Sequence, residues 1–102
     1  MTLNEYQAAA MKTCTDTSRR LDYMVLGLAS EASEVAGKLK KKIRDGEFDE
    51  KAMAKEVGDV LWYVAGAAEM LGYTLEDIAR INLHKLRNRA ENGTIAGSGD
   101  NR

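Results

Sequence analysis

Proline is absent from this 102-residue sequence, and cysteine, histidine, tryptophan and phenylalanine each occur once. A single cysteine excludes an internal disulfide. One cysteine with one histidine also excludes the Cys- and His-rich ligand sets of structural zinc sites. No apolar run approaches the ~20 residues that a membrane-spanning helix requires. What remains is a chain whose chemistry depends on carboxylates, amides, lysine and arginine.

An excess of charge of either sign is lacking too, because 15 basic residues face 16 acidic ones and the net charge is -1. This balance gives no electrostatic reason to expect DNA, RNA or an anionic membrane as a partner. The N-terminus lacks the basic region and apolar run of a secretory signal peptide. We therefore expect a cytoplasmic protein with no nucleic-acid and no membrane partner.

Helix-forming residues dominate the sequence, and apolar residues recur at three- and four-residue steps rather than at every second position. We predict an all-α domain over residues 1–92, with helices at 3–14, 20–44, 50–71 and 75–91. Residues 93–102, GTIAGSGDNR, are Gly-rich and predicted to form a flexible tail. Because so short a chain buries a modest core, the apolar stripes favour a four-helix bundle that associates as a homodimer or homotetramer.

Two carboxylate pairs lie inside the two long predicted helices: Glu31 and Glu34 form an ExxE, and Glu56 and Asp59 an ExxD. Residues three apart share nearly one helix face, so four acids converge if the helices fold back on each other. Converged carboxylates repel, and hard oxygen donors without His or Cys favour Mg²⁺, with Mn²⁺ as the alternative. The opposing interpretation is an exposed acidic face, with Glu34 paired to Lys38 four residues on.

The fourth predicted helix carries a polar stripe made by Asn82, Lys85 and Arg89. The stripe carries two positive charges, which a solvated surface would explain. Lys38 lies one turn beyond Glu34 and is a candidate for contact with phosphate.

The remaining distinctive residues are interpreted mainly as structural. Trp62 follows the ExxD by one turn, and we expect a core or interface contact rather than base stacking. Cys14 is expected to be partly buried and unreactive, and His84 to lie on the surface. Gly58, beside Asp59, is expected to let a neighbouring helix approach the acids closely.

Taken together, the ExxE, 21 intervening residues and the ExxD resemble the MazG-like family of all-α nucleoside triphosphate pyrophosphohydrolases. The segments GLASEASEVAGKLKK and EVGDVLWYVAGAAEMLGYTLEDIARINLHKLRNR are similar to helices of that family. The NxxKLxxR pattern resembles the family's phosphate-contacting helix, and GSGDNR resembles the tail of compact members. The resemblance implies that the substrate is bound by Lys38, Asn82, Lys85 and Arg89. The resemblance covers most of residues 20–102.

The resemblance implies Mg²⁺-dependent hydrolysis of a ribo- or deoxyribonucleoside triphosphate to the monophosphate and pyrophosphate, as nucleotide-pool house-cleaning. It implies metal binding by Glu31, Glu34, Glu56 and Asp59. Glu34 is the preferred residue for orienting or deprotonating the attacking water, with Glu31 next. Two alternatives stay open: a specific dUTPase or dCTPase of the same superfamily, and a non-catalytic helical oligomerisation or regulatory module. A di-iron carboxylate bundle is disfavoured because the Glu-x-x-His pattern is missing.

Overall fold

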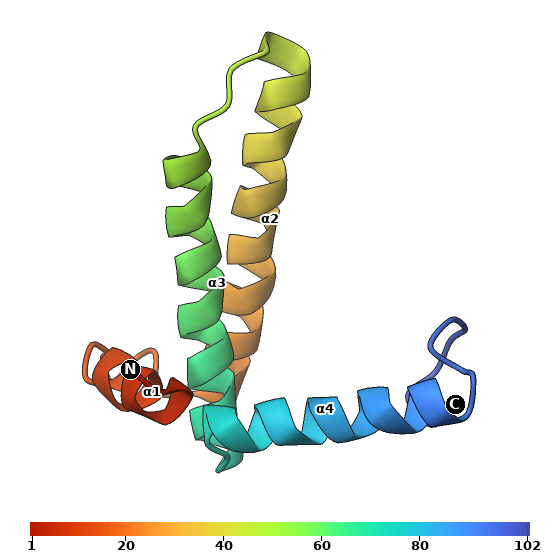
Figure 1. Ribbon diagram of the computed structural model, residues 1–102. Coiled ribbons are helices and arrows are strands. Elements are labelled where there is room, and N and C mark those ends of the chain that lie inside the picture. The colour runs from red at the N-terminus through yellow and green to blue at the C-terminus, as the bar shows by residue number, and fades with distance from the viewer.

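The computed structural model describes residues 1–102 and contains four helices and no strand (Figure 1). Helix α1 spans Leu3–Met11, α2 Leu21–Asp45, α3 Glu50–Leu71 and α4 Leu75–Glu91. The predicted all-α class and four helices are confirmed. Helix α1 ends three residues earlier than predicted, where the Thr13 hydroxyl donates a hydrogen bond to the Ala10 carbonyl and the chain turns away.

Side chains that cap the helices explain why most boundaries were predictable. Thr2 and Thr74 each form a capping box with the acid three residues on, and Asp49 accepts hydrogen bonds from two backbone N–H groups at the start of α3. Gly46 and Gly72 end α2 and α3 with φ of 76° and 82°, a left-handed conformation that glycine adopts without strain. Each signal acts within a few residues of the chain.

Helices α2 and α3 form a long antiparallel hairpin joined by residues 46–49 (Figure 1). Met24 of α2 is fully buried and packs against Gly66 of α3. A Cβ atom at Gly66 would overlap the Met24 side chain, so the glycine permits the close approach of the two helices. Met24 lies three residues after Leu21 and four before Leu28, so it belongs to the apolar stripe of this helix.

The core lies at the base of the hairpin, where α1, α3 and α4 meet. Its buried residues are Ala10, Met11, Ala65, Ala68 and Leu75. Cys14 and Trp62 are half-buried and pack against this cluster, as predicted for both. Because α1 supplies two of the five core residues, this short helix closes the end of the hairpin.

A buried amide sets the corner between α3 and α4. Gln7 is 5 % exposed and donates hydrogen bonds to the carbonyls of Ala65 and Tyr73 at 3.4 and 3.1 Å. Its side-chain oxygen accepts a hydrogen bond from the Leu75 N–H at 2.8 Å. These bonds satisfy backbone groups at the helix junction that would otherwise be buried without partners. Gln7 thereby determines the direction in which α4 leaves the base.

Helix α4 contacts α1 and α3 near the corner but does not contact α2, and its far end projects away from the hairpin (Figure 1). The radius of gyration is 16.2 Å, against about 13 Å for a compact domain of 100 residues. Many large apolar side chains are consequently exposed on the long helices, among them Val25, Leu26, Leu39, Ile43, Val57, Leu61, Ile81, Leu83 and Leu86. None of the four helices combines the length and apolarity needed to cross a membrane.

Candidate functional site

The hairpin brings the two acidic motifs together on one side of the chain. Glu31 of α2 meets Glu56 and Asp59 of α3, and one carboxylate oxygen from each lies within 4.8 Å of the others. Glu31 and Glu56 are half-buried, and Asp59 is exposed. The two helices run antiparallel, so residues that precede and follow the connecting loop by similar distances lie side by side. Three of the four acids predicted to converge therefore do so.

The electrostatics of this cluster are those of carboxylates without a counter-charge. The pKa of Glu31 is raised, first by desolvation and then by the negative charges of Asp59, Glu56 and Glu34. None of the ion pairs in the chain involves these acids. Clustered carboxylate oxygens with no basic partner form a donor set suited to a hard divalent cation. The residues present therefore fit a divalent metal.

Glu34 stands apart from the other three acids. It is exposed and lies outside the group of oxygens within 4.8 Å, although its charge contributes to the raised pKa of Glu31. No ion pair joins Glu34 to Lys38, so the interpretation of this pair as a surface salt bridge finds no support. Lys38 lines a separate recess of about 370 Å³ beside the α2–α3 loop, with Phe48 and Asp49. Lys38 therefore borders a different recess from Glu31 and Asp59, further along α2.

Two aromatic rings form a wall beside the acids. Glu31, Asp59, Trp62 and Tyr63 line a pocket of about 340 Å³. The rings of Trp62 and Tyr63 meet edge to face with centroids 4.9 Å apart. The Trp62 indole N–H donates to the Thr13 hydroxyl at 2.8 Å, which fastens this wall to the end of α1. Trp62 therefore serves the core and the pocket together, and Tyr63 is a pocket residue that no sequence motif indicated.

Tyr63 packs directly on a glycine of the facing helix. Gly27 of α2 lies directly against this ring, and a Cβ atom at Gly27 would overlap three of its atoms. The prediction that Gly58 lets a helix approach the acids is wrong within this chain, because a Cβ at Gly58 meets nothing within 4 Å. Gly58 faces open space, and the close approach of α2 and α3 occurs at Gly27 and Gly66 instead.

Gly27→Ala is expected to destabilise the protein by about 1–3 kcal/mol, because the added methyl must displace a packed tyrosine. Denaturant unfolding followed by circular dichroism measures this change. The matched control is Gly37→Ala on the same helix, where an added Cβ meets nothing within 4 Å. This control is expected to gain about 0.5–1 kcal/mol from helix propensity. Equal gains in both variants would show that Tyr63 is not held against Gly27.

The predicted phosphate-binding residues of α4 lie far from the acids of the same chain. Arg89 is about 21 Å along α4 from its first residue, and Asp59 is about 18 Å along α3 from its last, at about 1.5 Å per residue. The two helices diverge from their junction (Figure 1). Asn82 is exposed and makes no hydrogen bond through its side chain, whereas Lys85 and Arg89 contact the C-terminal tail. Within one chain, therefore, Lys85 and Arg89 do not reach the acidic cluster.

Comparisons with known proteins agree with this arrangement of motifs. The family model described as the MazG nucleotide pyrophosphohydrolase domain matches residues 19–94, which include both acidic pairs and the polar face of α4. The chain is also 39 % identical over 114 aligned positions to the Gene 37 protein of Mycobacterium phage L5, and the alignment covers all of both chains. No solved structure matches the chain with statistical significance.

Proposed function

The chain belongs to the MazG nucleotide pyrophosphohydrolase family, and from this membership we propose that it hydrolyses a nucleoside triphosphate to the nucleoside monophosphate and pyrophosphate with Mg²⁺ as cofactor. The observation that carries the proposal is the meeting of Glu31, Glu56 and Asp59 without any basic partner. A triphosphate is polyanionic, and a bare carboxylate cluster would repel it. The proposal therefore requires a divalent cation between the two.

Each group of residues has a distinct task in this proposal. Glu31, Glu56 and Asp59 hold the metal, which when bound neutralises phosphate charge and makes a coordinated water more acidic. Glu34 lies on the rim of the cluster, where its carboxylate can orient the attacking water or accept its proton, and Glu31 is the second candidate for that task. The rings of Trp62 and Tyr63 border the same pocket and suit the apolar faces of a nucleoside.

The phosphate-binding groups are proposed to come from a second copy of the chain. Lys85 and Arg89 suit a triphosphate, and arginine can bind two phosphate oxygens at once. Asn82 on the same helix would add hydrogen bonds to phosphate or sugar, and Lys38 would bind phosphate at the outer end of the cluster. Since α4 diverges from its own hairpin, these α4 side chains reach an acidic cluster only if α4 packs across a partner's hairpin. A complete site would then span two chains.

The surface area of the chain supports this second copy. The accessible surface is 7352 Å², whereas a compact monomer of this mass exposes about 5,700 Å². The excess, about 1,700 Å² per chain, is larger than the roughly 800 Å² that each partner buries in a standard interface. It matches an obligate dimer whose apolar helix faces cover each other.

A panel of ribo- and deoxyribonucleoside triphosphates, assayed with and without Mg²⁺, tests the proposed reaction. The expected products are the monophosphate and pyrophosphate in equal amounts, formed only when Mg²⁺ or Mn²⁺ is present. The same panel separates a broad pyrophosphohydrolase from a dUTPase or dCTPase. Absence of turnover with every triphosphate and both metals would contradict the proposal. Absence of a Mg²⁺- and nucleotide-dependent rise in melting temperature would then favour a non-catalytic oligomerisation module.

A further inference from the structure

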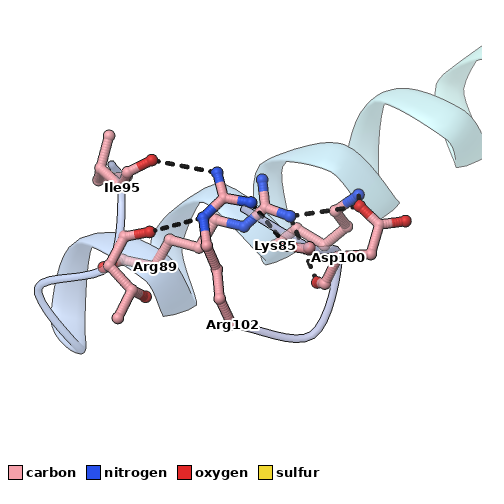
Figure 2. Close-up of polar contacts among 7 residues, drawn as sticks. Lys85, Arg89, Ile95, Asp100 and Arg102 are labelled. Carbon is pink, nitrogen blue, oxygen red and sulfur yellow. Dashed lines mark hydrogen bonds and ion pairs between the residues drawn. The ribbon is translucent and has the colours of Figure 1, made fainter. Parts of the chain in front are cut away.

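The C-terminal tail, residues 93–102, contains no helix or strand but follows a defined path back onto α4. The Thr94 N–H donates to the Arg89 carbonyl at 2.7 Å, which starts the return. The Arg102 guanidinium then donates to the carbonyls of Thr94, Ile95 and Gly99 at 3.0, 3.1 and 2.6 Å (Figure 2). Arg102 therefore closes the tail into a loop, because its guanidinium group binds carbonyl groups of other tail residues.

Within this loop Asp100 lies on the two cations of α4. One carboxylate oxygen, Oδ1, accepts from Lys85 Nζ at 2.7 Å and from an Arg89 terminal nitrogen at 3.3 Å (Figure 2). The Asp100 carbonyl accepts from the same Arg89 nitrogen at 3.3 Å. A single oxygen shared between a lysine and an arginine is the arrangement in which a phosphate oxygen would bind them.

Asp100 satisfies this pair of cations incompletely. Both of its contacts to Arg89 are long, and Arg89 Nε is buried with no hydrogen-bond partner. A buried donor without an acceptor is energetically costly. The adjoining recess of about 300 Å³ is lined entirely by polar residues: Lys85, Asn88, Arg89, Asn92, Asp100, Asn101 and Arg102. Arg89 thus keeps one unused donor beside this polar recess.

Access to Arg89 depends on the tail. With the tail in place Arg89 is only 9 % exposed, so little of its surface is open to an anion that enters the recess it lines. The Asp100 side chain is 80 % exposed, and ion pairs to such exposed groups stabilise a structure little. The pKa of Asp100 is lowered by its hydrogen bond to Lys85 and by the positive charges, so it is ionised at neutral pH. The tail is held in place, but weakly.

We infer that the C-terminal tail is an internal, displaceable ligand of the Lys85–Arg89 pair, in which the Asp100 carboxylate occupies the position of a phosphate oxygen until a phosphate group displaces it. A phosphate offers more acceptor oxygens and more charge than one carboxylate, so it can reach the unpaired Arg89 Nε as well. The measured anion affinity is then the intrinsic affinity reduced by the fraction of molecules whose tail is released. That the incoming phosphate belongs to a nucleotide follows only from the proposed function.

We call this control of anion binding by the tail the gate. Titration calorimetry with inorganic pyrophosphate, on the full chain without metal, tests it. Asp100→Asn is expected to bind pyrophosphate about 3–10-fold more tightly than wild type, because it raises the fraction of released tail. The matched control is Glu91→Gln, which removes the same charge at the end of α4 from a side chain that makes no ion pair. Glu91→Gln is expected to change the affinity less than twofold.

Arg102→Gln distinguishes the gate from a general effect of charge. This substitution removes a positive charge, so electrostatics alone would weaken pyrophosphate binding. It also removes the three hydrogen bonds that close the tail loop, so displacement of the tail predicts tighter binding. Weaker or unchanged binding in both Asp100→Asn and Arg102→Gln would overturn the gate, as would a wild type and variants that all fail to bind pyrophosphate.

The calorimetric readout is independent of turnover. If Asp100→Asn tightens pyrophosphate binding but no triphosphate is hydrolysed, the gate stands and the proposed function fails. If triphosphates are hydrolysed but neither tail variant binds pyrophosphate more tightly, the gate is contradicted and the proposed function stands. Helicity measured by circular dichroism is expected to stay at the wild-type value in both tail variants, because the tail lies outside the four helices.

Discussion

Glu56→Gln is expected to abolish triphosphate turnover while leaving the four helices intact. Glu56 of α3 is half-buried and its carboxylate meets those of Glu31 and Asp59, and glutamine keeps its size while removing the charge that a divalent cation needs. We expect kcat/KM to fall by at least about 100-fold at saturating Mg²⁺. A pyrophosphate-release assay measures this loss, and circular dichroism checks the helicity. Asp59→Asn is expected to behave in the same way.

The control for this loss is Glu69→Gln, the same substitution at an exposed position on the same helix. It is expected to retain wild-type turnover. A metal-binding readout adds a second check, since Mg²⁺ should raise the melting temperature of wild type but not of Glu56→Gln. Wild-type rates in both Glu56→Gln and Asp59→Asn at saturating Mg²⁺ would remove the acidic cluster from the reaction.

A mixture of two impaired variants is expected to regain activity if one site spans two chains. Lys85→Ala should weaken substrate binding, and Glu56→Gln should remove metal binding, so each alone is nearly inactive at low substrate concentration. After equal amounts are denatured together and refolded, half of the dimers contain one chain of each kind. Each such dimer holds one intact site, so about a quarter of wild-type activity should return in an isologous dimer.

The control mixture combines Glu56→Gln with Asp59→Asn. Both substitutions damage the acidic half of the site, so no mixed dimer contains an intact cluster and no activity should return. Activity equal to the mean of the two parents in the Lys85→Ala mixture would show that each chain carries its own complete site. A light-scattering mass equal to one chain would contradict the second copy directly.

Part of the candidate site was open to prediction because its spacing is local. Residues three apart share a helix face, so Glu56 and Asp59 were certain to point in a similar direction once α3 formed. The meeting of this pair with Glu31 required only that two helices joined by a short loop pack antiparallel. Glu34 did not follow the same rule, because the rotation of α2 about its axis decides which of its acids faces α3.

The packing of the glycines shows the limit of sequence reasoning. Gly27, Gly58 and Gly66 look alike in the sequence, since each lies inside a long helix and costs about 1 kcal/mol relative to alanine. Only the crossing of α2 and α3 shows that Tyr63 covers the first and Met24 covers the third, while the second remains open.

The sequence alone determined the four helices and most of their ends, because capping and apolar periodicity act over a few residues: Thr2, Asp49 and Thr74 begin helices, and Gly46 and Gly72 end two of them. Only the tertiary structure decided where α4 points and what lies on its cations. The buried amide of Gln7 sets that direction, and Asp100 arrives from beyond the end of α4. Both depend on contacts between segments separated along the chain, whose geometry no local pattern encodes.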